Sequence, residues 1–106
     1  MKPTLAASLT LCALSSLIIN AAAQDAPVDL VKVGAKTYDT NCAPCHGDKL
    51  VSSGIAFDLK RLREDERPRF DNSVTNGKNA MPSWRGVIKE KDLDALWAYI
   101  RANAYP

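Results

Sequence analysis

The run Cys42-Ala43-Pro44-Cys45-His46 constrains this chain more than any other stretch of its sequence. A C-x-x-C-H run marks the covalent attachment of a c-type haem. Each thiol adds to one haem vinyl group, and the histidine that follows is placed to bind the iron from one side. We therefore predict that Cys42 and Cys45 hold one haem c through thioether bonds and that His46 is an iron ligand.

Two other chemistries use the same residue types. A structural zinc site needs about four ligands, whereas residues 24–106 contain only these two cysteines and this one histidine. A redox-active disulfide of the thioredoxin kind sits in a βαβ pattern, and that pattern is absent around the run. Haem attachment is therefore the interpretation that we adopt.

Residues 1–23 are typical of a secretory signal peptide. Lys2 supplies the positive end, residues 5–19 are largely apolar, and Ala21-Ala22-Ala23 offers a cleavage site before Gln24. An uncleaved membrane anchor is the alternative, but the apolar run is short for a membrane span. We predict that the signal is cleaved and that the protein is exported.

The remaining residues, 24–106, are predicted to form one small domain. The hydrophobic core of a domain of this size gives only marginal stability unless a covalent link, metal or cofactor adds to it. A covalently held haem supplies a large apolar surface for the chain to wrap. The whole chain carries 14 basic and 12 acidic side chains and shows no basic arm, so we expect no nucleic-acid partner.

Export also fits haem attachment, which in bacteria takes place outside the cytoplasm. We therefore predict a periplasmic protein with no stable membrane anchor.

Apolar residues recur at roughly helical intervals from Val28 to about Thr40. They are Leu30, Val31, Ala35 and Tyr38. Gly34 lies inside this stretch, although glycine costs a helix about 1 kcal/mol relative to alanine. We expect that another helix approaches Gly34 so closely that no side chain fits there. A glycine that is merely tolerated is the alternative.

Two further helices are predicted downstream. One starts near Arg67-Pro68, because proline suits a first turn, and stops at Gly77, a C-terminal capping signal. The clearest helix spans about 90–103. It carries one apolar stripe, made of Leu93, Leu96, Trp97 and Ile100. No convincing strand appears, so the predicted fold class is all-α, with three to four helices and long loops wrapped around one covalently bound haem.

The loop after His46 carries four apolar residues that we expect to line or plug the haem pocket. They are Ile55, Phe57, Leu59 and Leu62. The segment from Lys60 to Arg69 is rich in charge, and such a run usually forms a solvated face.

The sixth coordination position of the iron decides between electron transfer and ligand chemistry. Residues 24–106 contain one methionine, Met81, in a loop after the predicted cap at Gly77 and beside Pro82. Core filler is the ordinary role of a methionine, but in a C-x-x-C-H chain we predict that Met81 is the second axial ligand. A thioether favours Fe(II), so ligation by His46 and Met81 raises the reduction potential and suits fast electron transfer.

The sequence resembles the class I cytochromes c over the whole of residues 24–106. The residues that carry the resemblance are Gly34, Tyr38, Cys42-x-x-Cys45-His46, Gly77-x-x-x-Met81-Pro82, Leu96 and Tyr99. The resemblance implies that the two terminal helices cross near a right angle, with Gly34 at their contact. It also implies that a backbone carbonyl fixes the ring of His46, but the sequence does not identify that carbonyl.

A closer likeness is to the haem domain of quinohaemoprotein alcohol dehydrogenases. It rests on His46-Gly47-Asp48, Ser53-Gly54, Asp58-Leu59-Lys60-Arg61 and Met81-Pro82. Phe57 departs from the pattern, because those domains often carry proline there. The likeness suggests that Lys60 or Arg61 binds a haem propionate, with an exposed basic pair as the alternative. Trp84, just after Met81, is expected to pack near the haem, with simple core filling as its alternative.

The predicted function is that of a periplasmic one-electron carrier, with no catalytic residue and no enzymatic activity of its own. The likeness implies a PQQ-dependent alcohol dehydrogenase as donor and an oxidase or another cytochrome of the respiratory chain as acceptor. We expect a monomer. Two alternatives stay open: a haem enzyme or gas sensor with an exchangeable sixth ligand, and a tightly bound haem subunit of a larger oxidoreductase.

Overall fold

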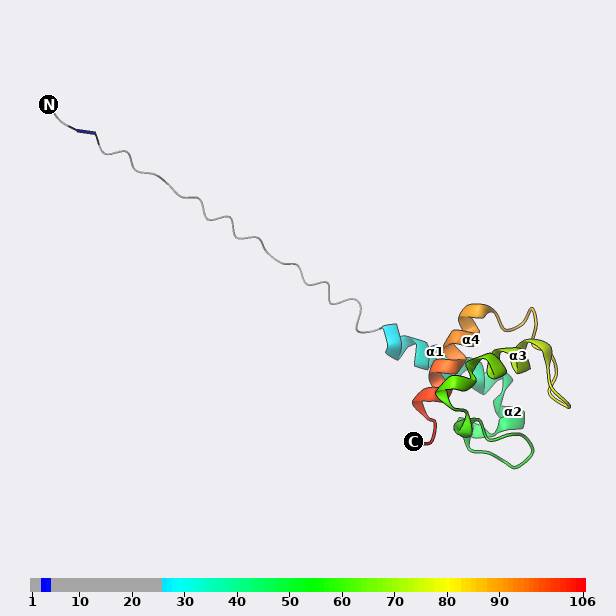
Figure 1. Cartoon of the computed structure of the whole chain (residues 1–106). Coiled ribbons are helices and arrows are strands. Elements are labelled where there is room, and N and C mark those ends of the chain that lie inside the picture. Colours follow the sequence, from blue (N-terminus) through cyan, green and yellow to red (C-terminus); the bar gives the residue numbers. More distant parts are fainter. Residues whose placement is uncertain (1–2, 5–25) are drawn as a thin grey trace.

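The computed structural model describes residues 3–4 and 26–106 (Figure 1). Apart from residues 3–4, the predicted signal peptide over 1–23 lies outside the described residues, so the signal and its cleavage stay a prediction. The helices are α1 (Ala26–Asn41), α2 (Ala43–His46), α3 (Arg67–Asn76) and α4 (Glu90–Ala102). No strand occurs in these two ranges, which confirms the all-α class. No helix within them is long and apolar enough to cross a bilayer.

The two terminal helices pack directly on each other at Gly34. A Cβ atom added to Gly34 of α1 would lie 1.9 Å from the backbone oxygen of Ala95 in α4. The neighbouring contact is aromatic, because the rings of Tyr38 and Tyr99 lie 5.4 Å apart. Figure 1 shows α4 lying against α1. The predicted close approach at Gly34 is therefore confirmed, and the glycine is there because the backbone of α4 fills the space.

Helix α3 begins and ends where the sequence predicts. Pro68 stands in its first turn, and its last residue is followed by Gly77, whose φ of 77° lies in the left-handed region that favours glycine. Its buried side chains are Phe70 and Val74. Because Phe70 also stacks on Trp97 of α4 at 5.3 Å between ring centroids, α3 and α4 share one apolar contact.

One arginine ties α3 to α4 on the outside of this contact. The Arg67 guanidinium donates to Asp71 and to Asp94, each at 2.7 Å. The same guanidinium lies over the Trp97 ring, with its carbon 5.8 Å from the ring centroid. The two helices that carry most of the buried apolar side chains are thus fixed relative to each other.

The buried core lies where α1, α3 and α4 meet. Its members are Tyr38, Leu50, Leu62, Phe70, Val74, Leu96, Tyr99 and Ile100. On the predicted stripe of α4, Leu96 and Ile100 are fully buried, while Leu93 and Trp97 are partly buried against the core.

Four short elements were not predicted from the sequence. They are α2 and three 3₁₀ turns, η2 (Asp48–Leu50), η3 (Leu59–Arg61) and η4 (Glu64–Glu66). Elements of three or four residues are shorter than the period from which a helix is recognised. They divide the long connection from α1 to α3 into short segments, of which α2, η3 and the loop between η2 and η3 contribute residues to the cavity described next.

Candidate haem site

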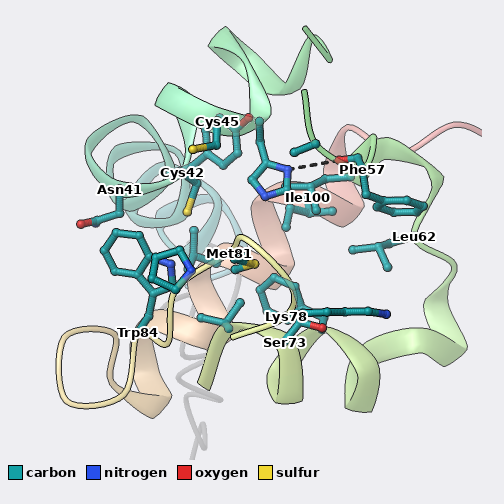
Figure 2. A pocket seen from close by; sticks show the side chains of 18 of the residues that line it. Asn41, Cys42, Cys45, Phe57, Leu62, Ser73, Lys78, Met81, Trp84 and Ile100 are labelled. Carbon is teal, nitrogen blue, oxygen red and sulfur yellow. Dashed lines mark hydrogen bonds between the residues drawn. The ribbon is translucent and has the colours of Figure 1, made fainter. Parts of the chain in front are cut away.

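The two cysteines are positioned by the junction between α1 and α2. Cys42 follows α1 directly, and its backbone N–H donates to the carbonyl of Tyr38 at 2.8 Å. The backbone N–H of His46 donates back to the carbonyl of Cys42 at 2.9 Å, which closes the single turn of α2. This turn brings Cys42, Cys45 and His46 to one side of the same cavity (Figure 2).

The cavity has a volume of about 380 Å³ and is mainly apolar. That volume is within the roughly 300–1,000 Å³ typical of cofactor sites. All four loop residues predicted to line it do so: Ile55, Phe57, Leu59 and Leu62. Core side chains of α3 and α4 form the opposite wall, namely Phe70, Val74, Leu96 and Ile100. An apolar cavity that carries two thiols, an imidazole and a thioether fits a covalently held haem.

The ring of His46 is held by a backbone carbonyl that the sequence did not identify. Its Nδ1 atom lies 3.1 Å from the carbonyl oxygen of Phe57, drawn as the dashed line in Figure 2. A carbonyl only accepts hydrogen bonds, so Nδ1 carries the proton and Nε2 keeps its lone pair free for a metal. Phe57 stands where the similar domains often carry proline, and it still supplies the backbone carbonyl that accepts from Nδ1.

Met81 lies in a loop that folds back on α3, directly after a tight turn formed by Asn79 and Ala80. The backbone of Lys78 and that of Met81 exchange two hydrogen bonds, of 3.1 Å and 2.9 Å. The backbone N–H of Trp84 then donates to the carbonyl of Val74 at 2.9 Å, which anchors the far end of the loop. The Met81 side chain is half-buried and points into the cavity (Figure 2). The structure therefore brings Met81 together with Cys42, Cys45 and His46.

The remaining predicted site residues divide into two groups. Trp84 lines the cavity, whereas Lys60 and Arg61 do not and instead border a separate surface pocket. Arg61 lies 3.9 Å from the carboxylate of Asp58, and the Lys60 ammonium lies over the Tyr105 ring at 5.7 Å. The contact of Lys60 or Arg61 with a propionate stays a prediction.

Two other cations line the cavity and were not singled out in the sequence. They are Arg69 of α3 and Lys78 of the Met81 loop. Arg69 directly precedes the buried Phe70 in the sequence. A single arginine in a charged segment does not indicate a cavity-lining residue. No acidic side chain lies among the described lining residues.

The protonation of Cys42 and Tyr38 follows from their burial. Burial, with a smaller effect from Cys45, raises the pKa of the Cys42 thiol to about 11. A reactive redox cysteine has a lowered pKa instead, so Cys42 is unlike the thiol of a disulfide oxidoreductase. Burial also raises the pKa of Tyr38 to about 12, and the neutral phenol donates to the carbonyl of Gly47 at 2.6 Å.

Comparison with known proteins places the chain in a family. A family model described as "Cytochrome C oxidase, cbb3-type, subunit III" matches residues 29–100. The chain belongs to the cytochrome c family and is a small class I cytochrome c, an electron carrier with covalently bound haem c.

Its relatives include both small cytochromes and parts of larger enzymes. Cytochrome c6 of Nostoc sp. is 36% identical over 76 residues, which are 67% of this chain and 68% of that protein. Cytochrome c550 of Pseudomonas aeruginosa is 37% identical over 68% of this chain and 54% of its own length. Quinohemoprotein alcohol dehydrogenase ADH-IIG of Pseudomonas putida is 30% identical over 71% of this chain, but over only 11% of the enzyme.

A solved structure agrees with the sequence comparison. The quinohemoprotein alcohol dehydrogenase ADHIIG of Pseudomonas putida HK5 superposes with a TM-score of 0.67 and 29% identity. The match covers 73% of this chain and 12% of the enzyme chain, so the chain is similar to one part of that enzyme. The predicted class I fold and the likeness to a quinohaemoprotein haem domain are thereby confirmed.

Proposed function

We propose that this chain is an exported, periplasmic one-electron carrier with one haem c, bound through Cys42 and Cys45 and ligated by His46 and Met81. The observation that carries the proposal is that these four side chains, from two distant parts of the chain, line one apolar cavity. The hydrogen bond from His46 to the Phe57 carbonyl supports it, because that bond leaves Nε2 as the free nitrogen.

A bound haem would supply a single iron centre that cycles between Fe(II) and Fe(III). The chain would hold this iron through His46 and Met81 and would exclude water from it. His46 presents a neutral imidazole, and Met81 presents a soft thioether that favours Fe(II) and raises the potential. The apolar walls made by Leu59, Leu62 and Leu96 keep the site dry. A site closed on both sides leaves no open position for dioxygen or peroxide.

The proposed electron donor is a PQQ-dependent alcohol dehydrogenase, and the acceptor is an oxidase or another cytochrome of the respiratory chain. Support for the donor comes from the likeness to one part of quinohemoprotein alcohol dehydrogenase ADH-IIG. The similar part makes up 12% of the ADHIIG chain. The role that we propose is a carrier that receives electrons from a dehydrogenase of this kind.

A second candidate is a tightly bound haem subunit of a larger oxidoreductase. The description of the matching family model, which names a subunit of an oxidase, favours it. The two candidates require the same haem site and differ only in the affinity for the partner.

One experiment separates the two candidates. The haem-loaded full chain is mixed in its oxidised form with a purified PQQ-dependent alcohol dehydrogenase and an alcohol, and haem reduction is followed by absorbance. A diffusible carrier is reduced with a rate that rises with its concentration and elutes alone on size exclusion. Reduction that is independent of concentration, with co-elution in one stable complex, supports the bound-subunit role. Absence of reduction by the dehydrogenase rejects the proposed donor.

A further inference from the structure

The carbonyl that holds His46 belongs to a segment with little structure of its own. Residues 51–58 contain no helix or strand, and Ile55 next to this point is 81% exposed. A side-chain bond from Ser53 to the carbonyl of Cys45 is long, at 3.5 Å. On the C-terminal side of Phe57, the Asp58 carboxylate accepts from the backbone N–H of Lys60 at 3.1 Å and from the Tyr105 hydroxyl at 3.2 Å. The other constraint on the Phe57 carbonyl is the Phe57 side chain, which is only partly covered.

Arg69 is the residue that covers Phe57. Its guanidinium carbon lies 4.9 Å from the centroid of the Phe57 ring, within the range of a cation–π contact. Arg69 belongs to the first turn of α3, a rigid element whose neighbours Phe70 and Val74 are buried in the core. The Phe57 ring, which belongs to a segment without helix or strand, thus contacts a residue of helix α3.

The guanidinium is itself fixed by an acidic partner. Arg69 donates to the carboxylate of Glu66 at 2.8 Å, and the backbone N–H of Arg63 donates to the other carboxylate oxygen at 2.9 Å. The bond from Arg63 and the bond from Arg69 together hold the pKa of Glu66 below its usual value, so the carboxylate stays charged. A continuous series of contacts therefore runs from Glu66 through Arg69 and Phe57 to His46.

We propose that Arg69 is a positioning residue for His46: by stacking on Phe57 it holds the Phe57 carbonyl against Nδ1 and thereby tunes the imidazole as an iron ligand. This inference rests on the proposed function, in which His46 binds the haem iron. A firm hydrogen bond at Nδ1 raises the basicity of the ring. A more basic ring favours Fe(III), so loosening the bond raises the reduction potential.

A direct charge effect of Arg69 has the opposite sign. Because Arg69 lines the cavity, its positive charge also disfavours Fe(III). Removing that charge alone lowers the potential, whereas removing the stacking contact raises it. A variant that keeps every charge and removes only the ring therefore separates the two effects.

The test compares three variants of the haem-loaded full chain. Phe57→Leu keeps the carbonyl and all charges, Arg69→Gln removes the cation, and Lys78→Gln removes the other cation that lines the cavity and serves as the matched control. The measurement is the exchange of the His46 Nδ1 proton with deuterated water, followed by NMR in the reduced protein. We expect exchange about two- to fivefold faster in Phe57→Leu and in Arg69→Gln, the range set by an exposed cation–π contact. Lys78→Gln should leave the exchange rate unchanged.

The double variant and the potential complete the test. In Phe57→Leu, adding Arg69→Gln should give no further acceleration, and Phe57→Leu alone should raise the potential. If Phe57→Leu fails to retain haem, Phe57→Tyr replaces it in the test. Because Phe57→Tyr keeps the aromatic ring, its exchange rate should equal that of the unmodified protein, whereas Arg69→Gln should still exchange faster. The inference is overturned if Arg69→Gln exchanges the His46 Nδ1 proton at the rate of the unmodified protein. It is also overturned if Arg69→Gln accelerates this exchange equally in the unmodified protein and in Phe57→Leu. If the unmodified reduced protein shows no haem-shifted His46 ring signals, the proposed function has failed instead.

Discussion

At the scale of single residues, Tyr38 links the helix contact to the cysteine turn. Its ring is fully buried against Tyr99, and its hydroxyl donates to the carbonyl of Gly47, just after His46. Tyr38 was among the residues that carry the resemblance to class I cytochromes c, but the partner of its hydroxyl was not predicted. One side chain thus fixes the end of α2 against the α1–α4 contact.

Tyr38→Phe should lower the free energy of unfolding by about 1–2 kcal/mol, because the carbonyl of Gly47 loses its partner while the packing stays. The pKa of Tyr38 rises from 10.0 to about 12 on burial, so above pH 10 an unfolded chain loses this proton while the native chain keeps it. The contribution is therefore fully present below pH 10 and is lost as the pH rises toward 12. Denaturant unfolding of the haem-loaded protein measures both the loss of stability and its pH dependence. If the free energy of unfolding falls equally between pH 10 and 12 in the unmodified protein and in Tyr38→Phe, the predicted titration of Tyr38 is contradicted.

The covalent link is also a property of single residues. Because both thiols become thioethers in this account, haem should remain on the chain after acid-acetone extraction and in denaturing electrophoresis. The double variant Cys42→Ala, Cys45→Ala should lose that covalent haem and much of its stability, since the cavity loses its largest apolar component. Free haem extracted from the unmodified protein would show that the attachment is wrong.

The residue scale also shows where sequence reasoning stops. Cys42, Cys45, His46 and Met81 were identified because few side chains have their chemistry, and the structure places all four in one cavity. The Phe57 carbonyl was not identified, because every residue carries a carbonyl and only the folded loop selects one.

At the scale of elements, the helices were predictable and the short turns between them were not. Helices α1 and α4 carry recurring apolar residues, and α3 has clear end signals in Pro68 and Gly77. The turns η3 and η4 depend on single capping contacts, for example the bond from the backbone of Lys60 to the side chain of Asp58 at 3.1 Å. Local bonds of this kind leave no repeating pattern in a sequence.

The contact between α1 and α4 gives the prediction for this scale. Gly34→Ala should destabilise the protein by about 3 kcal/mol, because the new Cβ meets the Ala95 carbonyl and forces the helices apart. Alanine's better helix propensity recovers only about 1 kcal/mol. Lys36→Ala, at an exposed position of the same helix, is the control and should change stability by less than about 0.5 kcal/mol. Thermal or denaturant unfolding measures the stability of both variants. If Gly34→Ala is as stable as Lys36→Ala, the close approach of α4 to Gly34 is contradicted.

At the scale of the whole molecule, charge and exposed apolar surface define how a partner can dock. The net charge of the chain is only +2, which gives little long-range steering. Ile55 and Phe57, at the border of the cavity, are exposed and apolar. The class of the molecule was predictable from its motifs, whereas the predicted donor rests on the family likeness alone, because a docking surface of this kind carries no motif.

The rate of reduction by the dehydrogenase should therefore fall only modestly with salt. We expect a decrease of no more than about threefold between low and physiological ionic strength. The docking patch is expected to be mainly apolar, with Lys60, Arg61 and Arg63 at its rim. Stopped-flow kinetics at several salt concentrations provide the measurement. A steep decrease would instead indicate docking driven by those charges.

The most direct test of the central claim, a haem closed on both sides by His46 and Met81, is the binding of carbon monoxide to the reduced protein. In the unmodified protein we predict no uptake at neutral pH and, after oxidation, a low-spin spectrum with the weak far-red thioether band. Met81→Ala should bind carbon monoxide and lower the potential by on the order of 0.1 V, a part of the roughly 0.8 V that axial ligands span. Met81→His should keep the iron six-coordinate but also lower the potential. Rapid uptake of carbon monoxide by the unmodified protein, without the far-red band, would contradict the account and favour a sensor or a catalyst.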